Sequence, residues 1–206
     1  HGIVRNVRIE HCKAEPPTRE FVDERPHSKT YRKNWFYRPG YDDFPNSSGL
    51  AALAVENVDG GTVENVTYRN IVANGSRSPI FVRAGTRSGR SCGTPPSDKY
   101  VFRNITIENV TGGAMSAVAR SISGVPGCRL VGMTLKDVRI KCRGLGETTA
   151  ERTRPVPEAV GGYPDAHMFG CMLPAYGLYV RHVDGFCLEN VVFELEAGTS
   201  DRRDPI

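Results

Sequence analysis

A short strand-like motif recurs along this chain, and it constrains the fold more than any other feature of the sequence. Each copy has Asn or Gly third in a run of six residues, and apolar and polar residues mostly alternate after it. Such alternation is the period-2 pattern of a half-buried strand. Gly132 takes the Asn position in one copy, because either residue can occupy a turn-like or bulged position. The five copies are residues 4–9, 63–68, 102–107, 130–135 and 188–193.

A second set of strand-like segments, richer in small apolar residues, alternates with the first at 50–55, 79–83, 114–118 and 175–183. Asn65 and Asn104 are 39 residues apart, and Gly132 follows 28 residues later. This spacing suits one coil of a solenoid with variable loops, and no stretch has a sustained helical period. We therefore predict an all-β fold, a right-handed single-stranded parallel β-helix of about five coils with long loop insertions. Its Asn side chains are expected to stack at the corners and to hydrogen-bond between coils.

Three loops interrupt the predicted coils, at 13–48, 85–100 and 141–174. Loops of such length in a compact domain usually carry function. Residues 31–38 combine aromatic and basic side chains, which suit an acidic sugar, although packing of the loop onto the coil is the alternative. The 206 residues are enough for one domain with a sizeable core, so we expect a single β-helix domain over residues 1–206.

Charge and cysteine content narrow the choice of partners. The net charge of +4 suits an anionic partner such as nucleic acid or an acidic polysaccharide. The basic residues form no dense run, so ordinary surface charge is the alternative, and we expect no nucleic-acid partner. No apolar run approaches the roughly 20 residues of a membrane span. The six cysteines form no C-x-x-C pair, so we expect no zinc site. No other residues have metal-ligand spacing, and we expect no cofactor. Disulfides and buried free thiols are both open possibilities.

Four longer segments, at 53–61, 79–87, 163–170 and 173–183, resemble glycoside hydrolase family 28, the polygalacturonases and their bacterial relatives. Together with the coil pattern, the resemblance covers nearly the whole chain. It implies an inverting hydrolase of pectic polysaccharide, of the galacturonan or rhamnogalacturonan type, that is secreted or periplasmic. Its expected substrate is therefore the acidic polysaccharide of the plant cell wall.

The catalytic motifs of that family are absent from this sequence. Inverting hydrolysis needs a protonated carboxyl at the leaving oxygen and a carboxylate that activates water. The family carries aspartates in N-T-D and D-D motifs, followed by G-H-G and a lysine motif such as R-I-K. This sequence has no N-T-D and no G-H-G; Lys141 ends an isolated R-I-K, and Asp42-Asp43 lies in a loop between Gly40 and Pro45. We predict that the chain holds no catalytic residue, is truncated at the N-terminus and possibly the C-terminus, and is inactive alone.

Six residues are candidates for binding substrate on the flank of the cleft. Arg83 and Arg87 lie at or just after a short strand, where a guanidinium can pair with a sugar carboxylate. Glu56 follows the preceding strand of the same set, so stacking places it beside Arg83 as a salt bridge or as a cleft wall. The late loop is expected to overhang the groove. The candidates are Arg83, Arg87, Glu56, Asp59, Tyr163 and His167.

Two other functions fit the same fold. A polysaccharide lyase fragment would require a basic residue and often calcium, and the sequence has no acidic cluster suited to calcium. A non-catalytic β-helix that binds carbohydrate or serves a structural role is the other alternative, because fold does not fix function. The particular pectic substrate, the endo or exo mode of action and the oligomeric state are left open.

Overall fold

The computed structural model describes residues 2–15, 49–86 and 100–206, except residues 115, 119, 148, 163, 165 and 167. Every regular element in these ranges is a β-strand, and the named strands pair in parallel. The strands are β1 (Ile3–Glu10), β2 (Lys13–Ala14), β3 (Gly49–Asn57), β4 (Gly61–Ala84), β5 (Tyr100–Ala114), β6 (Arg120–Ser123), β7 (Leu130–Cys142), β8 (Leu178–Arg181) and β9 (Val183–Leu195).

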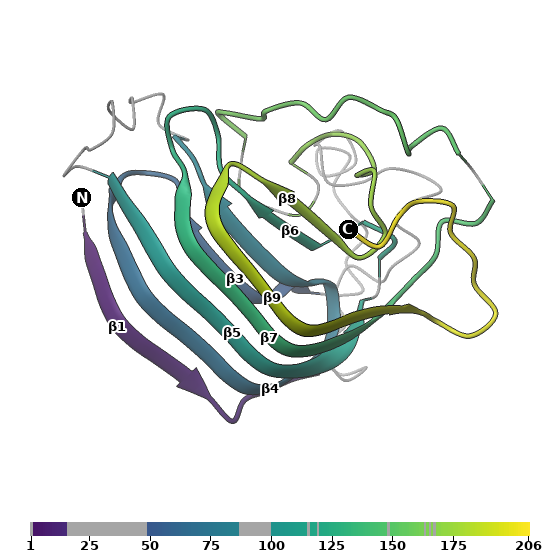
Figure 1. Cartoon of the computed structure of the whole chain (residues 1–206), viewed down its shortest axis with the longest axis horizontal. Coiled ribbons are helices and arrows are strands. Elements are labelled where there is room, and N and C mark those ends of the chain that lie inside the picture. Colours follow the sequence, from purple (N-terminus) through teal and green to yellow (C-terminus); the bar gives the residue numbers. More distant parts are fainter. Residues whose placement is uncertain are drawn as a thin grey trace, which may run out of the picture.

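The strands form the predicted parallel β-helix. β1, β4, β5, β7 and β9 stack in that order on one side, and β3, the second half of β4, β6 and β8 stack on the other (Figure 1). The long strand β4 belongs to both sides because it passes through the corners of its coil. The described ranges contain no helix with the length and apolar character needed to cross a membrane.

The core consists of rows of apolar side chains that run from coil to coil. Ile105 and Met133 are register partners and are almost completely buried. Each such side chain contributes about 1.5–3 kcal/mol through burial, relative to an exposed position. Because successive strand residues point to opposite faces, only the alternating apolar residues enter the interior. One row contains Val7, Val66, Ile105, Met133 and Phe186.

Each coil contains two corners five residues apart, and residues with positive φ occupy both. Asn tolerates the left-handed conformation because its short polar side chain bonds locally. At the first corner, the Asn104 amide donates to Asn65 Oδ1 at 3.0 Å, and the Asn65 amide donates to Asn6 Oδ1 at 2.9 Å. These bonds confirm the predicted stacking of Asn side chains between coils. The second corner holds His11, Asn70, Asn109, Asp137 and Asn190.

The prediction that the last copy of the sequence motif lies at the same corner as the other copies is wrong. Its Asn190 lies beside Asp137 at the second corner, donating to Asp137 Oδ1 at 2.7 Å, whereas Gly185 lies beside Gly132 at the first corner. Asn190 therefore lies five residues after the position that matches Asn65, Asn104 and Gly132 in the earlier coils. The physical reason is that both corners take a left-handed residue followed by alternating side chains, so the local pattern does not distinguish them.

The predicted strand at 114–118 is also misplaced. β5 ends at Ala114, and the next strand is β6, which pairs with β4 through Phe81–Ser121 and Arg83–Ser123. All four side chains of β6 are buried, although three are polar. A strand covered on both faces lacks the alternation by which half-buried strands are detected.

Charged side chains alternate in sign along one outward row of the stack. Its ion pairs include Arg69–Glu108 at 3.6 Å and Lys136–Glu189 at 2.7 Å. Exposed pairs contribute about 0–1 kcal/mol each. They nevertheless favour one register, since a slip of one residue would move every side chain to the other face. The row contains Glu10, Arg69, Glu108, Lys136 and Glu189.

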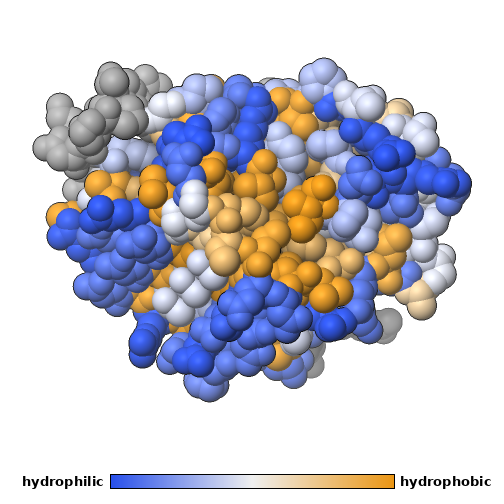
Figure 2. All heavy atoms as spheres, in the orientation of Figure 1, coloured by the Kyte–Doolittle hydropathy of each residue, from blue (hydrophilic) through white to orange (hydrophobic). Residues whose placement is uncertain are grey.

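The first and last coils leave part of their inward rows exposed. Leu188 of β9 is 40% exposed, whereas its register partner Leu135 in β7 is fully buried. Val4 of β1 is 46% exposed, although its partner Val63 packs against the core. In the view of Figure 2, apolar surface runs across the middle of the molecule, between hydrophilic regions.

Candidate functional site

Two of the predicted binding residues, Glu56 and Arg83, lie on the outward side of the sheet formed by β3, β4, β6 and β8. Glu56 pairs in register with Arg83, as the stacking argument required. Ser123 and then Arg181 continue the same row on β6 and β8. One polar row therefore crosses four strands near their C-terminal ends.

Arg83 is buried within this row, with only 2% of its surface exposed. Its guanidinium lies over the Phe169 ring, 5.8 Å from the centroid. Burial lowers the pKa of Arg83 to about 10, so the group is still a cation at neutral pH. Its acceptors, at 2.8–3.2 Å, are Ser123 Oγ and the carbonyls of Gly124, Glu158 and Ala159. This placement argues against the predicted pairing of Arg83 with a sugar carboxylate, because the guanidinium is buried against protein acceptors.

A second arginine holds the same loop segment. Arg181 donates to the Val156 carbonyl at 2.8 Å and forms an ion pair with the Glu158 carboxylate. The other oxygen of Glu158 lies 3.0 Å from His182 Nε2. All three side chains are partly exposed. Arg181, His182 and Glu158 thus form a polar cluster that fastens residues 156–159 to the edge of the sheet.

Apolar contacts complete the cover over this face. Phe81 points outward from β4 and packs with Phe169 and Leu173 of the loop that follows β7. Phe169 also contacts Tyr179 edge to face, with ring centroids 5.8 Å apart. The loop therefore buries the outward side of β4, whereas the outward side chains Ala54 and Glu56 of β3 are exposed.

Comparison with known proteins agrees with this architecture. The family model for glycosyl hydrolases family 28 matches residues 53–159, slightly more than half of the chain. The chain belongs to glycosyl hydrolases family 28. It is 26% identical over 88 residues to an exopolygalacturonase of Zea mays, a match that covers 43% of this chain and 22% of the maize protein. No solved structure gives a significant match.

Among the predicted binding residues of this family 28 chain, Glu56 and Asp59 are exposed near the end of β3. Both are accessible from solvent, and their contact with substrate stays a prediction. Arg87, Tyr163 and His167 lie outside the described residues, as do Asp42-Asp43 and the aromatic and basic segment 31–38.

Sequence reasoning missed the cluster of Arg181, His182 and Glu158. Arg181 and His182 belong to a segment that resembles the family, but nothing in their spacing singles them out, and Glu158 lies in an irregular loop. The Glu158 carboxylate contacts two basic side chains, Arg181 and His182, and this arrangement suits the anchoring of a loop. Glycoside hydrolysis by inversion instead needs two carboxyls about 6.5–9.5 Å apart on either side of the bond.

The described cysteines are of two kinds. Cys128 is buried and disulfide-bonded, whereas Cys12, Cys142 and Cys187 are free thiols. Within the part of the chain that the structure describes, no group of three or more His, Cys, Asp or Glu side chains is placed to hold a metal ion.

Proposed function

We propose that this family 28 chain is part of an inverting hydrolase that cleaves pectic polysaccharide of the galacturonan or rhamnogalacturonan type. The observation that carries the proposal is the family match over β-helix coils, supported by similarity to an exopolygalacturonase. The net charge of +4 favours an anionic polysaccharide partner.

We place the catalytic carboxyls of the parent protein in further coils that stack on β1. The exposed inward side chain of Val4, at 46%, is the surface that another coil would cover. In this arrangement the present chain forms the flank of the cleft. It binds acidic pectin weakly and does not cut it.

The flank is formed in this proposal by the open part of the outward face beside β3. Glu56 and Asp59 are the described candidates there, and Arg87, Tyr163 and His167 are proposed to join them. Arg83 acts from beneath this surface by holding residues 158–159 in place.

The test compares this chain with a version extended upstream. Reducing ends released from polygalacturonic acid and from rhamnogalacturonan are measured for both, together with the ultraviolet absorbance of unsaturated products. Release by the extended protein alone, without unsaturated products, is expected. Unsaturated products would indicate a lyase instead. Release of no product from either substrate would favour a binding module, and release by the present chain alone would point to carboxylates such as Asp42 and Asp43.

We further propose that the protein is exported, as secreted or periplasmic enzymes are. The disulfide at Cys128 supports this compartment because disulfides persist in oxidising environments. Fractionation of cells that produce the parent protein tests the proposal, and accumulation in the cytosol would contradict it.

A further inference from the structure

An arginine points into the interior of the solenoid from β6. Arg120 is 0% exposed and pairs in register with Leu178, and Ile122 of the same strand belongs to the apolar core. Its Nη2 donates to the Val118 carbonyl at 2.7 Å, whereas its Nε has no hydrogen-bond partner among the described residues. Arg120 therefore brings a positive charge into a row of apolar side chains.

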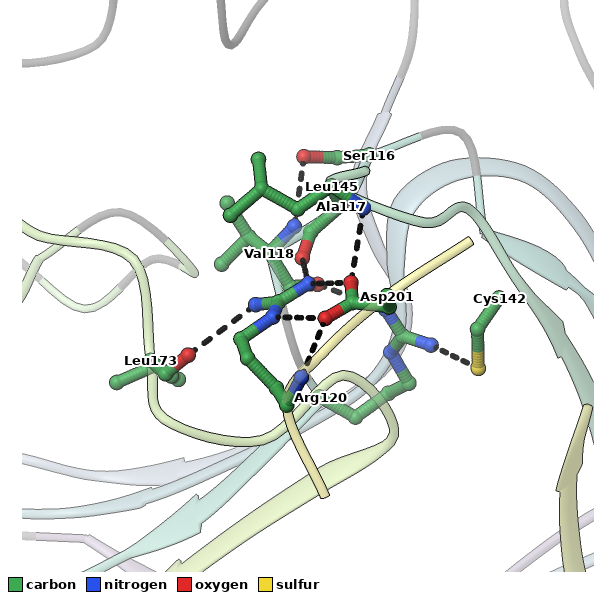
Figure 3. Close-up of polar contacts among 9 residues, drawn as sticks. Ser116, Ala117, Val118, Arg120, Cys142, Leu145, Leu173 and Asp201 are labelled. Atoms are coloured by element: carbon green, nitrogen blue, oxygen red, sulfur yellow. Dashed lines mark hydrogen bonds and ion pairs between the residues drawn. The ribbon is translucent and has the colours of Figure 1, made fainter. Parts of the chain in front are cut away.

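The remaining guanidinium nitrogen faces a thiol. Arg120 Nη1 lies 2.7 Å from Sγ of Cys142, a free cysteine at the end of β7 that is also 0% exposed (Figure 3). Charge-assisted hydrogen bonds to oxygen are about 2.7–2.9 Å long, and sulfur is larger than oxygen. The contact is thus short for a neutral thiol. The other contact of Sγ, with the Ile140 carbonyl, is 3.6 Å long.

The buried carboxylate of Asp201 already has its own partner. Arg203 and Asp201 form an ion pair at 2.6 Å, and their side chains are 0% and 1% exposed. Asp201 also accepts from the Leu145 backbone amide at 2.8 Å. The charge of Arg203 is therefore balanced, and Cys142 is the acidic group in hydrogen-bond contact with Arg120. The other ionisable groups whose charges act on Cys142 are Arg203, Glu196 and Tyr176.

Ordinary pKa values favour loss of the Cys142 thiol proton over loss of a proton from the Arg120 guanidinium. At pH 7 a thiol with an ordinary pKa of about 8.5 is ionised at a ratio of about 1 to 30, whereas a guanidinium with a pKa above 12 loses its proton in fewer than about 1 in 10⁵ cases. A buried cation without a counter-ion carries a large desolvation cost. Burial raises the pKa of the Cys142 thiol above its ordinary value, and the adjacent Arg120 offsets this rise only in part, so the case for ionisation rests on the short contact and on the charge balance.

We propose that Cys142 is ionised in the folded chain and is the counter-ion of Arg120. The four buried groups then form a neutral set, in which Arg120–Cys142 joins β6 to β7 and Arg203–Asp201 joins the C-terminal segment to the loops. Arg203 reaches the carbonyls of Leu173 and Ala117 at 3.1 and 2.9 Å, which ties that segment to two other parts of the chain. This assignment is independent of the proposed hydrolase activity.

The first experiment measures thiolate by its ultraviolet absorbance at pH 6 in the folded chain and in denaturant. Exposed cysteines are almost fully protonated at this pH, since their ordinary pKa is about 8.5. One thiolate per chain is expected in the folded protein and none after unfolding. Equal absorbance in the two states would overturn the proposal, and this comparison requires no variant to fold.

Variants then assign the signal to one sulfur. Cys142→Ser and Arg120→Met are each expected to abolish the thiolate absorbance, the second with the cysteine still present. Cys187→Ser removes an exposed free thiol and serves as the matched control, with the absorbance unchanged. A signal that survives in folded Cys142→Ser, or disappears in Cys187→Ser, would refute the assignment.

Stability at different pH gives a second readout. The folded chain would hold one proton fewer than the unfolded chain below pH 8, so its stability gains from rising pH. The unfolding equilibrium constant of the natural chain, divided by that of Cys142→Ser, is expected to fall about tenfold per pH unit between pH 6 and 8. A ratio that does not change with pH would contradict an ionised Cys142.

Discussion

Single residues at the corners explain why Asn recurs in this sequence. Asn104 has a φ of 56°, and its side chain bonds the equivalent Asn65 in the preceding coil. The next coil has Gly132 at this place, with a φ of 71°. The position thus selects residues that tolerate the left-handed conformation, and Asn adds a hydrogen bond that Gly cannot form.

Substitutions at Asn104 separate these two contributions. Asn104→Ala is expected to lower the free energy of unfolding by about 2 kcal/mol, since it loses the bond and strains the backbone. Asn104→Gly loses the bond alone and is expected to cost about 1 kcal/mol. Urea unfolding measures both values. Equal losses for the two variants would show that backbone strain is not what the position selects against.

A variant of the buried Arg83 separates a role in stability from a role in binding substrate. Arg83→Met is expected to lower the free energy of unfolding by about 3 kcal/mol or more, because it leaves buried acceptors without donors. The control Arg139→Met, at an exposed ion pair with Glu194, is expected to cost less than about 1 kcal/mol. Thermal or urea unfolding measures both. A stable Arg83→Met chain that has lost affinity for polygalacturonate would restore the predicted binding role.

The elements of this fold derive their stability from stacking rather than from pairs of strands alone. β7 lies between β5 and β9, so its inward side chains are covered from both directions. β9 carries equivalent inward residues, but most of them are partly exposed. An inward leucine in β7 is therefore expected to contribute more to the free energy of unfolding than the matching leucine in β9.

Leu135 and Leu188 form a matched pair that tests this difference, since they are register partners with 0% and 40% exposure. Leu135→Ala is expected to lower the free energy of unfolding by about 2–5 kcal/mol. Leu188→Ala is expected to cost roughly 1 kcal/mol, because much of its side chain already contacts water. Urea unfolding distinguishes the two. Equal losses would mean that a further contact covers β9.

Buried polar groups, as well as rows of apolar side chains, hold the whole molecule together. The loop after β7 is held on the outward face by Arg83 and Arg181, and the C-terminal segment is held by Arg203 and Asp201. Burial raises the pKa of Asp201, but hydrogen bonds from Arg203 and from the Leu145 amide outweigh it, so the pKa lies below its ordinary value.

This lowered pKa predicts how stability depends on acidity. The folded state keeps Asp201 ionised at pH values where the unfolded chain binds a proton, so its contribution is complete above about pH 4 and is lost as the pH falls further. Asp201→Asn is expected to be less stable at pH 7 and to show a weaker loss between pH 4 and pH 2. Equilibrium unfolding across this range measures the effect. An unchanged acid profile in the variant would assign the loss to other carboxyls.

The sequence by itself determined the strand repeat, the solenoid and the corner asparagines, because alternation and left-handed backbone preferences are properties of a few neighbouring residues. Contacts between distant segments decided the rest. They set Asn190 at the second corner, buried Arg83 beneath residues 158–159 and brought Arg120 to Cys142. A buried charge looks the same in the sequence as an exposed one, since its burial depends on partners that only the folded chain brings together.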